Sequence, residues 1–136
     1  VYAGHVLLVT RKSNPGKGYY ALPGGFLNQN ETIRQCTIRE LKEETSISTD
    51  AVVLDKCAKE THVFDHPLRS LRGRTITHAT LFELDFNKPM PQIKGGDDAA
   101  TALWMPFNEL GLHEEWFFDD HIHIIGYFLS GKLYNR

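Results

Sequence analysis

The sequence predicts a single α/β domain in which a mixed β-sheet is flanked by helices. The 136 residues are enough for one domain with one hydrophobic core. The shares of hydrophobic residues, 41%, and charged residues, 24%, are ordinary for a globular protein. Segments with strand and helix patterns alternate irregularly, and no internal repeat interrupts them. This combination favours one mixed sheet with helices packed around it.

The first half of the chain contains two expected strands and one helix. His5–Arg11 is an apolar run typical of a buried strand, and the turn-rich SNPGKG stops it. Tyr19–Leu22 is expected to form a short strand that ends at the following Pro-Gly-Gly. Glu31–Glu44 has a helical pattern, with Asn30 as the expected N-cap and an acidic residue favourable in the first turn.

The second half is expected to contain three strands and one longer helix. Ala51–Phe64 and Arg74–Asp85 have the pattern of two long strands separated by DHPLRSLRG. A loop rich in proline and glycine leads to a strand around Ala102–Met105. Pro106 opens a short helical turn, and the last helix is expected over Asp119–Leu129.

Charge and composition exclude several classes of protein. The net charge of −2 gives no general attraction for nucleic acid, and no apolar run approaches the ~18 residues of a membrane span. The opening VYAGHVLLVTRK does not have the pattern of a signal peptide. With only Cys36 and Cys57, we expect buried thiols in a reduced, cytoplasmic setting. The start at Val1 is consistent with a part of a longer polypeptide.

Three carboxylates on the expected helix are the strongest chemical signal in the chain. At about 100° per helical residue, Glu40, Glu43 and Glu44 fall within an arc roughly 100° wide. Like charges so close lower helix stability by a few tenths of a kcal/mol per pair, roughly, and a divalent cation would remove that penalty. The alternative is a solvated acidic face supported by Arg39 and Lys42.

Two glycines precede this helix, at positions where the backbone can approach a metal or phosphate closely. The segment from residue 25 to residue 47 resembles the Nudix box, a pattern of glycine, acidic and aliphatic residues at fixed spacing. The matching positions are Gly25, Glu31, Arg39, Glu40, Leu41, Glu43, Glu44 and Ile47. The one departure is Ser46, where the pattern has glycine in a left-handed turn. Serine there costs about 1 kcal/mol, unless the turn differs.

The resemblance implies a Nudix α/β/α sandwich with a catalytic loop-helix-loop. It implies Mg²⁺ as the metal, with Mn²⁺ as an alternative. The principal metal ligands would be Glu40 and Glu44, with Glu43 as an additional or outer ligand and the Gly24 carbonyl completing the shell. Glu31 and Arg39 would form a structural ion pair. Tyr20 matches the aromatic residue that usually precedes the box, and we place it among the substrate-binding residues.

A second informative segment carries Arg69, Arg72 and Arg74 within six residues, with only Asp65 nearby in sequence. Such arginines suit recognition of phosphate oxygens or stacking on a base, and a solvated hairpin tip is the alternative. The segment resembles the Nudix domain of proteins that fuse a nicotinamide mononucleotide adenylyltransferase to an ADP-ribose pyrophosphatase. The implied reaction converts ADP-ribose and water to AMP and ribose 5-phosphate. It also implies a fused adenylyltransferase domain as a candidate partner.

The sequence contains two further sets of residues with side chains suited to catalysis or metal binding, one acidic and one of histidines. Nudix enzymes often carry an acidic residue before the last core strand, which makes Asp98 and Asp97 candidates for a general base; a turn formed by GGDD is the alternative. His121 and His123 point different ways on a helix, so we interpret them as ordinary surface or packing residues.

Two other functions stay open at this stage. One is a Nudix pyrophosphatase for another nucleotide substrate. The other is a regulator that binds ADP-ribose without cleaving it, although we expect such a protein to need a DNA-binding module. An oligomeric assembly is also compatible with the sequence.

Overall fold

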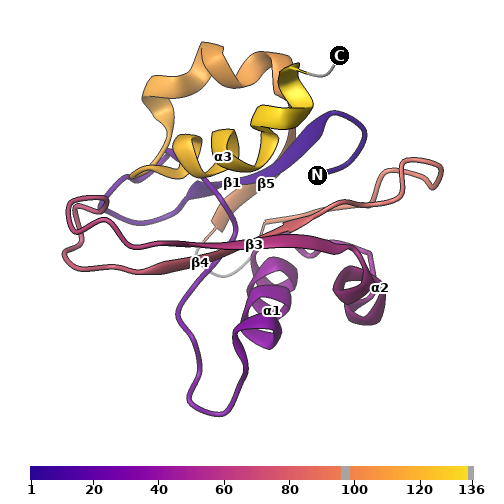
Figure 1. Cartoon of the computed structure of the whole chain (residues 1–136), viewed down its shortest axis with the longest axis horizontal. Helices are drawn as coiled ribbons and strands as arrows, with labels where there is room; N and C mark the ends of the chain where they lie inside the picture. Colours follow the sequence, from indigo (N-terminus) through magenta and orange to yellow (C-terminus); the bar gives the residue numbers. More distant parts are fainter. Residues whose placement is uncertain (96–98, 135–136) are drawn as a thin grey trace.

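The computed structural model describes residues 1–95 and 99–134. A layer of strands has helix α3 on one side and helices α1 and α2 on the other (Figure 1), which is the expected α/β/α sandwich. The elements in chain order are β1 (His5–Arg11), β2 (Tyr20–Ala21), α1 (Ile33–Thr45), α2 (Ala51–Lys56), β3 (Ala58–Phe64), β4 (Thr77–Phe82), β5 (Ala99–Pro106), a 3-10 helix η1 (Phe107–Trp116) and α3 (His121–Tyr134).

The strands form two antiparallel groups. The first has the order β2-β1-β5, with Val9 opposite Ala21 and Val6 opposite Met105. The second is the hairpin of β3 and β4. A parallel bridge between Tyr20 and Phe117 joins the short strand β2 to the residue after η1. β1 thus lies in the centre of the larger group, as its apolar run predicted.

The side chains of β1 are buried on both faces of the sheet. Val6 and Leu8 pack in one cluster with Leu129 of α3. Leu7, on the opposite face, packs with Leu54 of α2 in a second cluster. Because successive residues of a strand point to opposite faces, a strand covered on both sides has a continuous apolar run. This is why the HVLLVTR segment shows no polar alternation.

Helix α1 starts two residues later than the sequence predicted. Its N-cap is Thr32, whose side chain accepts a hydrogen bond from the backbone N–H of Gln35, while the Gln35 side chain accepts one from the Thr32 N–H. This reciprocal capping box competes successfully with Asn30. Glu31 therefore lies outside the helix, where its carboxylate is directed to Arg39 instead.

The expected single strand over residues 51–64 is wrong in its first half. Ala51–Lys56 forms helix α2, and strand β3 begins only at Ala58. The two valines at positions 52 and 53 favour a strand locally. The fully buried Leu54 packs against Leu7 and Ile47, and this tertiary contact accompanies the helical turn.

Two other boundaries also differ from the prediction. β4 covers Thr77–Phe82, and so it is shorter than the expected strand over residues 74–85. The Arg74 side chain donates to the carbonyl of Asp65 within the preceding loop. Helix α3 begins at His121, after Asp119, whose φ of 47° lies in the left-handed region and cannot belong to a right-handed helix.

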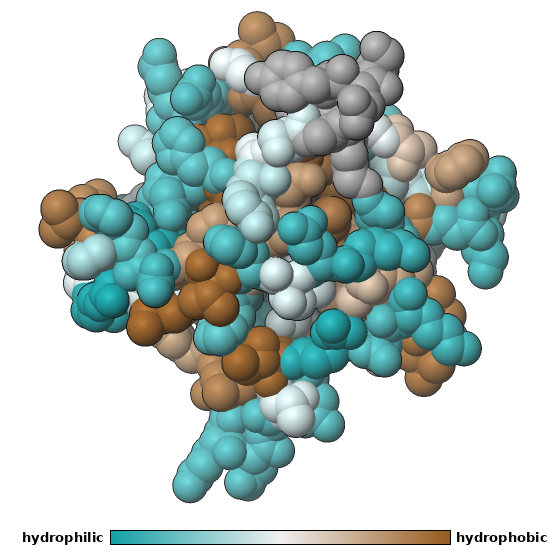
Figure 2. Space-filling view, viewed as in Figure 1, coloured by the Kyte–Doolittle hydropathy of each residue, from teal (hydrophilic) through white to brown (hydrophobic). Residues whose placement is uncertain are grey.

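The surface carries exposed apolar side chains at the loop of residues 65–76, which joins β3 to β4. Leu68 and Leu71 in this loop are 85% and 90% exposed. In Figure 2 brown and teal side chains are mixed at the left, over the tip of this hairpin. Within residues 1–95 and 99–134, no helix has the length and apolar character needed to cross a membrane.

Helix α1 ends at Ser46 in the left-handed turn where the Nudix pattern has glycine. Its φ and ψ are 49° and 31°, and its N–H donates to the carbonyl of Lys42. The left-handed turn is thus kept at position 46, although a side chain in this conformation is strained.

We expect Ser46→Gly to raise the free energy of unfolding by about 0.5 kcal/mol. A left-handed conformation costs an L-residue about 1–2 kcal/mol, and the greater freedom of glycine in the unfolded chain offsets part of the gain. Urea denaturation measures the difference. Ser46→Ala keeps the Cβ atom and should bring no gain, and a glycine variant no more stable than the parent would contradict this explanation.

Candidate functional site

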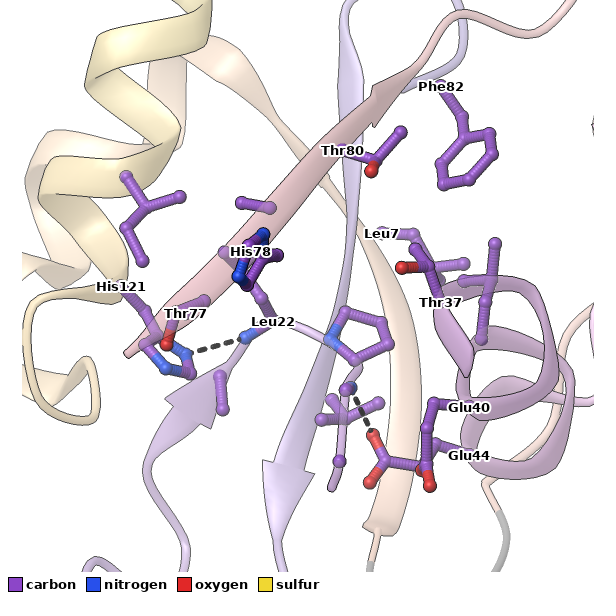
Figure 3. Close-up of a pocket in the computed structure, with 18 of the residues that line it drawn as sticks. Leu7, Leu22, Thr37, Glu40, Glu44, Thr77, His78, Thr80, Phe82 and His121 are labelled. Carbon is purple, nitrogen blue, oxygen red and sulfur yellow. Dashed lines mark hydrogen bonds between the residues drawn. The ribbon is translucent and has the colours of Figure 1, made fainter. Parts of the chain in front are cut away.

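The three carboxylates of α1 differ in exposure. The Glu40 side chain is 14% exposed and the Glu43 side chain 42% exposed, while Glu44 is buried. Glu40 and Glu44 lie beside each other at one end of the cavity shown in Figure 3. Their spacing of four residues places them on the same helix face. The more exposed Glu43 lies toward solvent.

The backbone of the glycine pair before α1 lies close to the carboxylates of Glu40 and Glu44. The N–H of Gly24 donates to Oε2 of Glu44 at 3.0 Å. A Cβ atom on Gly25 would lie 2.4 Å from the carboxyl carbon of Glu40, a distance no real contact allows. A side chain at position 25 would therefore displace the Glu40 carboxylate from its place beside the backbone.

Arg39 holds the acidic cluster together. Its guanidinium donates to Glu31 at 2.6 and 2.9 Å, to Glu40 at 2.7 Å and to Glu43 at 3.1 Å. The hydrogen bonds from Arg39 lower the pKa of Glu31 to about 2, with a further contribution from the Asn28 N–H. The ion pair of Glu31 and Arg39 is therefore present, and the same arginine also reduces the repulsion among the helix carboxylates.

A cavity of about 630 Å³ extends from these carboxylates between β1, β4, α1 and α3. This volume lies in the range of roughly 300–1,000 Å³ that is usual for small-molecule sites. Thr77, His78 and His121 line it toward its other end (Figure 3). Arg72 also lines it, which brings one arginine of the loop to the same cavity as the carboxylates.

The donor set suits a hard divalent cation. Among the described residues, no three His, Cys, Asp or Glu side chains form a closed metal cage. Glu40 and Glu44 instead offer carboxylate oxygens beside a backbone that already approaches too closely for a Cβ atom. Mg²⁺ and similar ions keep several waters and take only one or two carboxylates together with substrate oxygens. An open pair of carboxylates beside a cavity meets that requirement.

The three arginines of the loop have different environments. Arg69 is only 4% exposed; it donates to both oxygens of Asp120 at 2.9 and 2.7 Å and to the carbonyl of Thr75 at 3.1 Å. Arg74 donates to the carbonyl of Asp65. Neither is among the residues that line the cavity.

Arg72 is the exception. Its side chain is 32% exposed, lies 3.8 Å from Asp119, and extends over the rings of Phe118 and Phe26 at 5.2 and 5.9 Å.

The structure gives the arginines of this loop partners that are distant in sequence. The loop does have acidic partners, since Asp119 and Asp120 approach it from the start of α3. Arg69 is held more firmly than Arg74, because its buried guanidinium donates to both carboxylate oxygens of Asp120. No local pattern could indicate a partner 51 residues away.

Tyr20 lies apart from the cavity. Its ring packs against His113 and Phe117 at 5.6 Å in each case. It is not among the residues that line the cavity. The ring of Tyr20 is thus packed against its neighbours, and substrate binding by Tyr20 stays a prediction. Asp97 and Asp98, the candidates for a base, lie outside the described residues.

His121 is the residue that the sequence reasoning missed. It was expected to be a surface or packing residue, but its Nδ1 accepts a hydrogen bond at 3.0 Å from the backbone N–H of Leu22 (Figure 3). Burial lowers the pKa of His121 to about 4, so the ring is neutral near pH 7. This histidine lies two residues after an aspartate in the left-handed backbone conformation. No local sequence pattern there predicts such a contact.

The fold, the acidic helix and the glycine pair together define a domain of the Nudix class. The NUDIX domain profile matches residues 1–125, and the chain belongs to this family.

Two curated relatives share substantial sequence with the chain. The ADP-ribose pyrophosphatase of Methanocaldococcus jannaschii is 38% identical over 105 residues, which cover 77% of this chain and 56% of the relative. The ADPR responsive transcriptional repressor NtrR of Acinetobacter baylyi is 30% identical over 118 residues, covering 85% and 43%. The chain thus spans about half the length of these relatives.

Among solved structures, a bifunctional NMN adenylyltransferase/ADP-ribose pyrophosphatase from Francisella tularensis, in complex with AMP and a manganese ion, superposes with a TM-score of 0.92. It is 41% identical, and the match covers 96% of this chain and 39% of that one. The NUDIX domain of Shewanella oneidensis NrtR, complexed with ADP ribose, has a TM-score of 0.72 at 24% identity, covering 89% of this chain and 73% of that one, which shows a shared fold.

We expect Gly25→Ala to weaken binding of Mn²⁺ by about 10–100-fold, because the added methyl group displaces the Glu40 carboxylate. Electron paramagnetic resonance of free Mn²⁺ measures the affinity directly. Gly24→Ala is the matched control, since a Cβ atom there would meet nothing within 4 Å, and it should lose much less. Equal losses in the two variants would argue against the close contact at position 25.

Proposed function

We propose that this domain hydrolyses the pyrophosphate bond of a nucleoside diphosphate derivative, with ADP-ribose as the preferred substrate and AMP and ribose 5-phosphate as products. The observation that carries the proposal is the placement of the buried Glu44 carboxylate, the half-buried Glu40 carboxylate and a glycine backbone at one end of a cavity that Arg72 also lines. The name of the Methanocaldococcus jannaschii relative supports the choice of substrate.

Glu40 and Glu44 would hold the metal, with Glu43 as an outer ligand and the Gly24 carbonyl as a further oxygen donor. A bound Mg²⁺, or Mn²⁺ in its place, offsets the charge of the pyrophosphate and lowers the pKa of an attacking water. The backbone N–H of Gly24 fixes one oxygen of Glu44, which leaves the orientation of that carboxylate set before the metal arrives. Arg39 does the same for Glu40.

Arg72 is the residue we assign to the substrate phosphates. A guanidinium can donate two parallel hydrogen bonds to phosphate oxygens, and this one lies at the cavity with a partly exposed side chain. Its position over two phenylalanine rings also suits stacking against a base. Arg69 and Arg74 would support the shape of the loop instead.

The proposal also includes a domain fused to this one and the cellular compartment of the protein. The Francisella tularensis relative joins an adenylyltransferase to the matching region, and we propose an equivalent fused domain for this protein. Both cysteines in the described residues are free thiols, which is consistent with a reduced, cytoplasmic environment. Mass spectrometry of the native protein would test the fusion.

A second candidate is a domain that binds ADP-ribose without cleaving it. The similarity to the ADPR responsive repressor of Acinetobacter baylyi favours this reading. Both candidates require ADP-ribose to bind, so only product formation separates them. We favour the enzyme because all three carboxylates of the box are present, and binding without any AMP release at saturating Mg²⁺ would favour the sensor.

We expect Glu44→Gln to lower turnover of ADP-ribose at least about 100-fold at saturating Mg²⁺, because a charged metal ligand is lost while the size is kept. AMP release followed by chromatography measures this. Glu43→Gln is the matched control on the same turn, and its exposed carboxylate predicts a smaller loss. Near-normal activity of Glu44→Gln would remove Glu44 from the metal site.

The base that activates water is proposed to be Asp98, with Asp97 as the substitute. A positioned base contributes about 10²–10⁴-fold to the rate. We therefore expect either Asp98→Asn or Asp97→Asn to lower turnover by such a factor and to change its pH dependence. If both variants behave like the parent, the base lies elsewhere, with Glu43 the next candidate.

Substitutions of the loop arginines should affect different properties, namely substrate binding for one arginine and stability for another. We expect Arg72→Ala to raise the Michaelis constant for ADP-ribose roughly tenfold to a hundredfold with the fold intact. Arg69→Ala should instead lower the free energy of unfolding by about 1.5–3 kcal/mol, because it leaves Asp120 without its bidentate partner. Steady-state kinetics and urea denaturation measure the two effects, and an unchanged Michaelis constant for Arg72→Ala would contradict its assignment.

A further inference from the structure

The segment Leu22–Gly25 contains the glycine pair and runs past the carboxylates of Glu40 and Glu44. Hydrogen bonds hold it to the helices on both sides of the sandwich. On the α1 side, the Gly24 N–H donates to Glu44 at 3.0 Å. On the α3 side, the Leu22 N–H donates to Nδ1 of His121 at 3.0 Å. Both bonds are dashed in Figure 3. Pro23 lies between them with a fixed φ, so the position of one bond restricts the other.

The imidazole of His121 has a defined form and a fixed place. Because Nδ1 accepts from a backbone N–H, the ring proton is on Nε2. The low pKa that follows from burial keeps the ring neutral. The ring of Phe118 packs at right angles to it, at 5.6 Å. The preceding residue, Asp120, is tied to Arg69 by two hydrogen bonds. The position of the acceptor therefore does not depend on Leu22 alone.

We propose that His121 is a positioning residue for the metal site, acting through the Leu22–Gly25 segment. Its Nδ1 sets the place of the Leu22 N–H and, across Pro23, the distance of the glycine backbone from Glu40 and Glu44. This inference rests on the proposed function in one respect, namely that these two carboxylates hold a divalent cation. Without the acceptor, the Leu22 N–H would lose its partner in a partly buried place and the segment would shift toward another one.

Three substitutions at position 121 separate the acceptor from the ring. In His121→Asn the side-chain oxygen occupies nearly the place of Nδ1, whereas in His121→Gln the oxygen lies one bond further out. His121→Phe keeps a ring without any acceptor. We expect the asparagine variant to bind Mn²⁺ within about twofold of the parent, and the other two roughly tenfold more weakly. Electron paramagnetic resonance of free Mn²⁺ gives these affinities without any turnover.

Hydrogen exchange of the Leu22 amide tests the contact itself, and it should be fast in the phenylalanine variant and slow in the asparagine variant. His123→Phe changes an exposed histidine of the same helix and should bind Mn²⁺ like the parent. A parent protein that binds no Mn²⁺ would overturn the proposed function. A parent that binds Mn²⁺ while His121→Phe binds it equally well, or while His121→Asn is as weak as His121→Phe, would overturn the role of His121.

Discussion

The repulsion among three carboxylates on the last two turns of α1 is the constraint on which the site depends. Left alone, such charges weaken a helix and turn their side chains toward water. Here Arg39 donates to Glu40 and Glu43, and the backbone N–H of Gly24 donates to Glu44. These contacts offset the repulsion while keeping Glu40 and Glu44 at the cavity. The carboxylates are thus oriented before any cation or substrate binds.

The part of the site that the sequence predicts is the part built from near neighbours. The carboxylates, Arg39 and the glycine pair lie within about two dozen residues, so helix periodicity and the Nudix pattern are enough to bring them together. Strand β1 could be predicted from the sequence equally well, because burial on both faces leaves a continuous apolar run. Even the departure at Ser46 was informative, since the left-handed turn is kept despite the side chain.

The features that sequence reasoning missed depend on contacts between distant residues. Asp120 and Arg69 are 51 residues apart, and Leu22 and His121 are 99 residues apart. Helix α2 was mistaken for a strand because two valines favour that conformation locally, whereas Leu54 is buried against Leu7 of β1. In each case the deciding partner lies on another element, where no local periodicity can indicate it.

The contrast between Arg69 and Arg72 gives one loop a supporting arginine and, under the proposed function, an arginine for the substrate phosphates. Asp120 accepts two hydrogen bonds from Arg69, whose side chain is only 4% exposed, so that guanidinium is committed to supporting the loop. Asp119 lies 3.8 Å from Arg72, and among the described residues its buried Oδ2 has no hydrogen-bond partner. Arg72 is therefore held nearby by charge but not by a hydrogen bond, so a phosphate oxygen can replace the carboxylate as its partner. His121 follows Asp120 directly in the sequence. The turn at the start of α3 that supports this loop therefore also supports the segment that leads to the glycine pair. Under the proposed function, the carboxylates that would hold the cation and the arginine that would bind the substrate thus both depend on the turn at the start of α3.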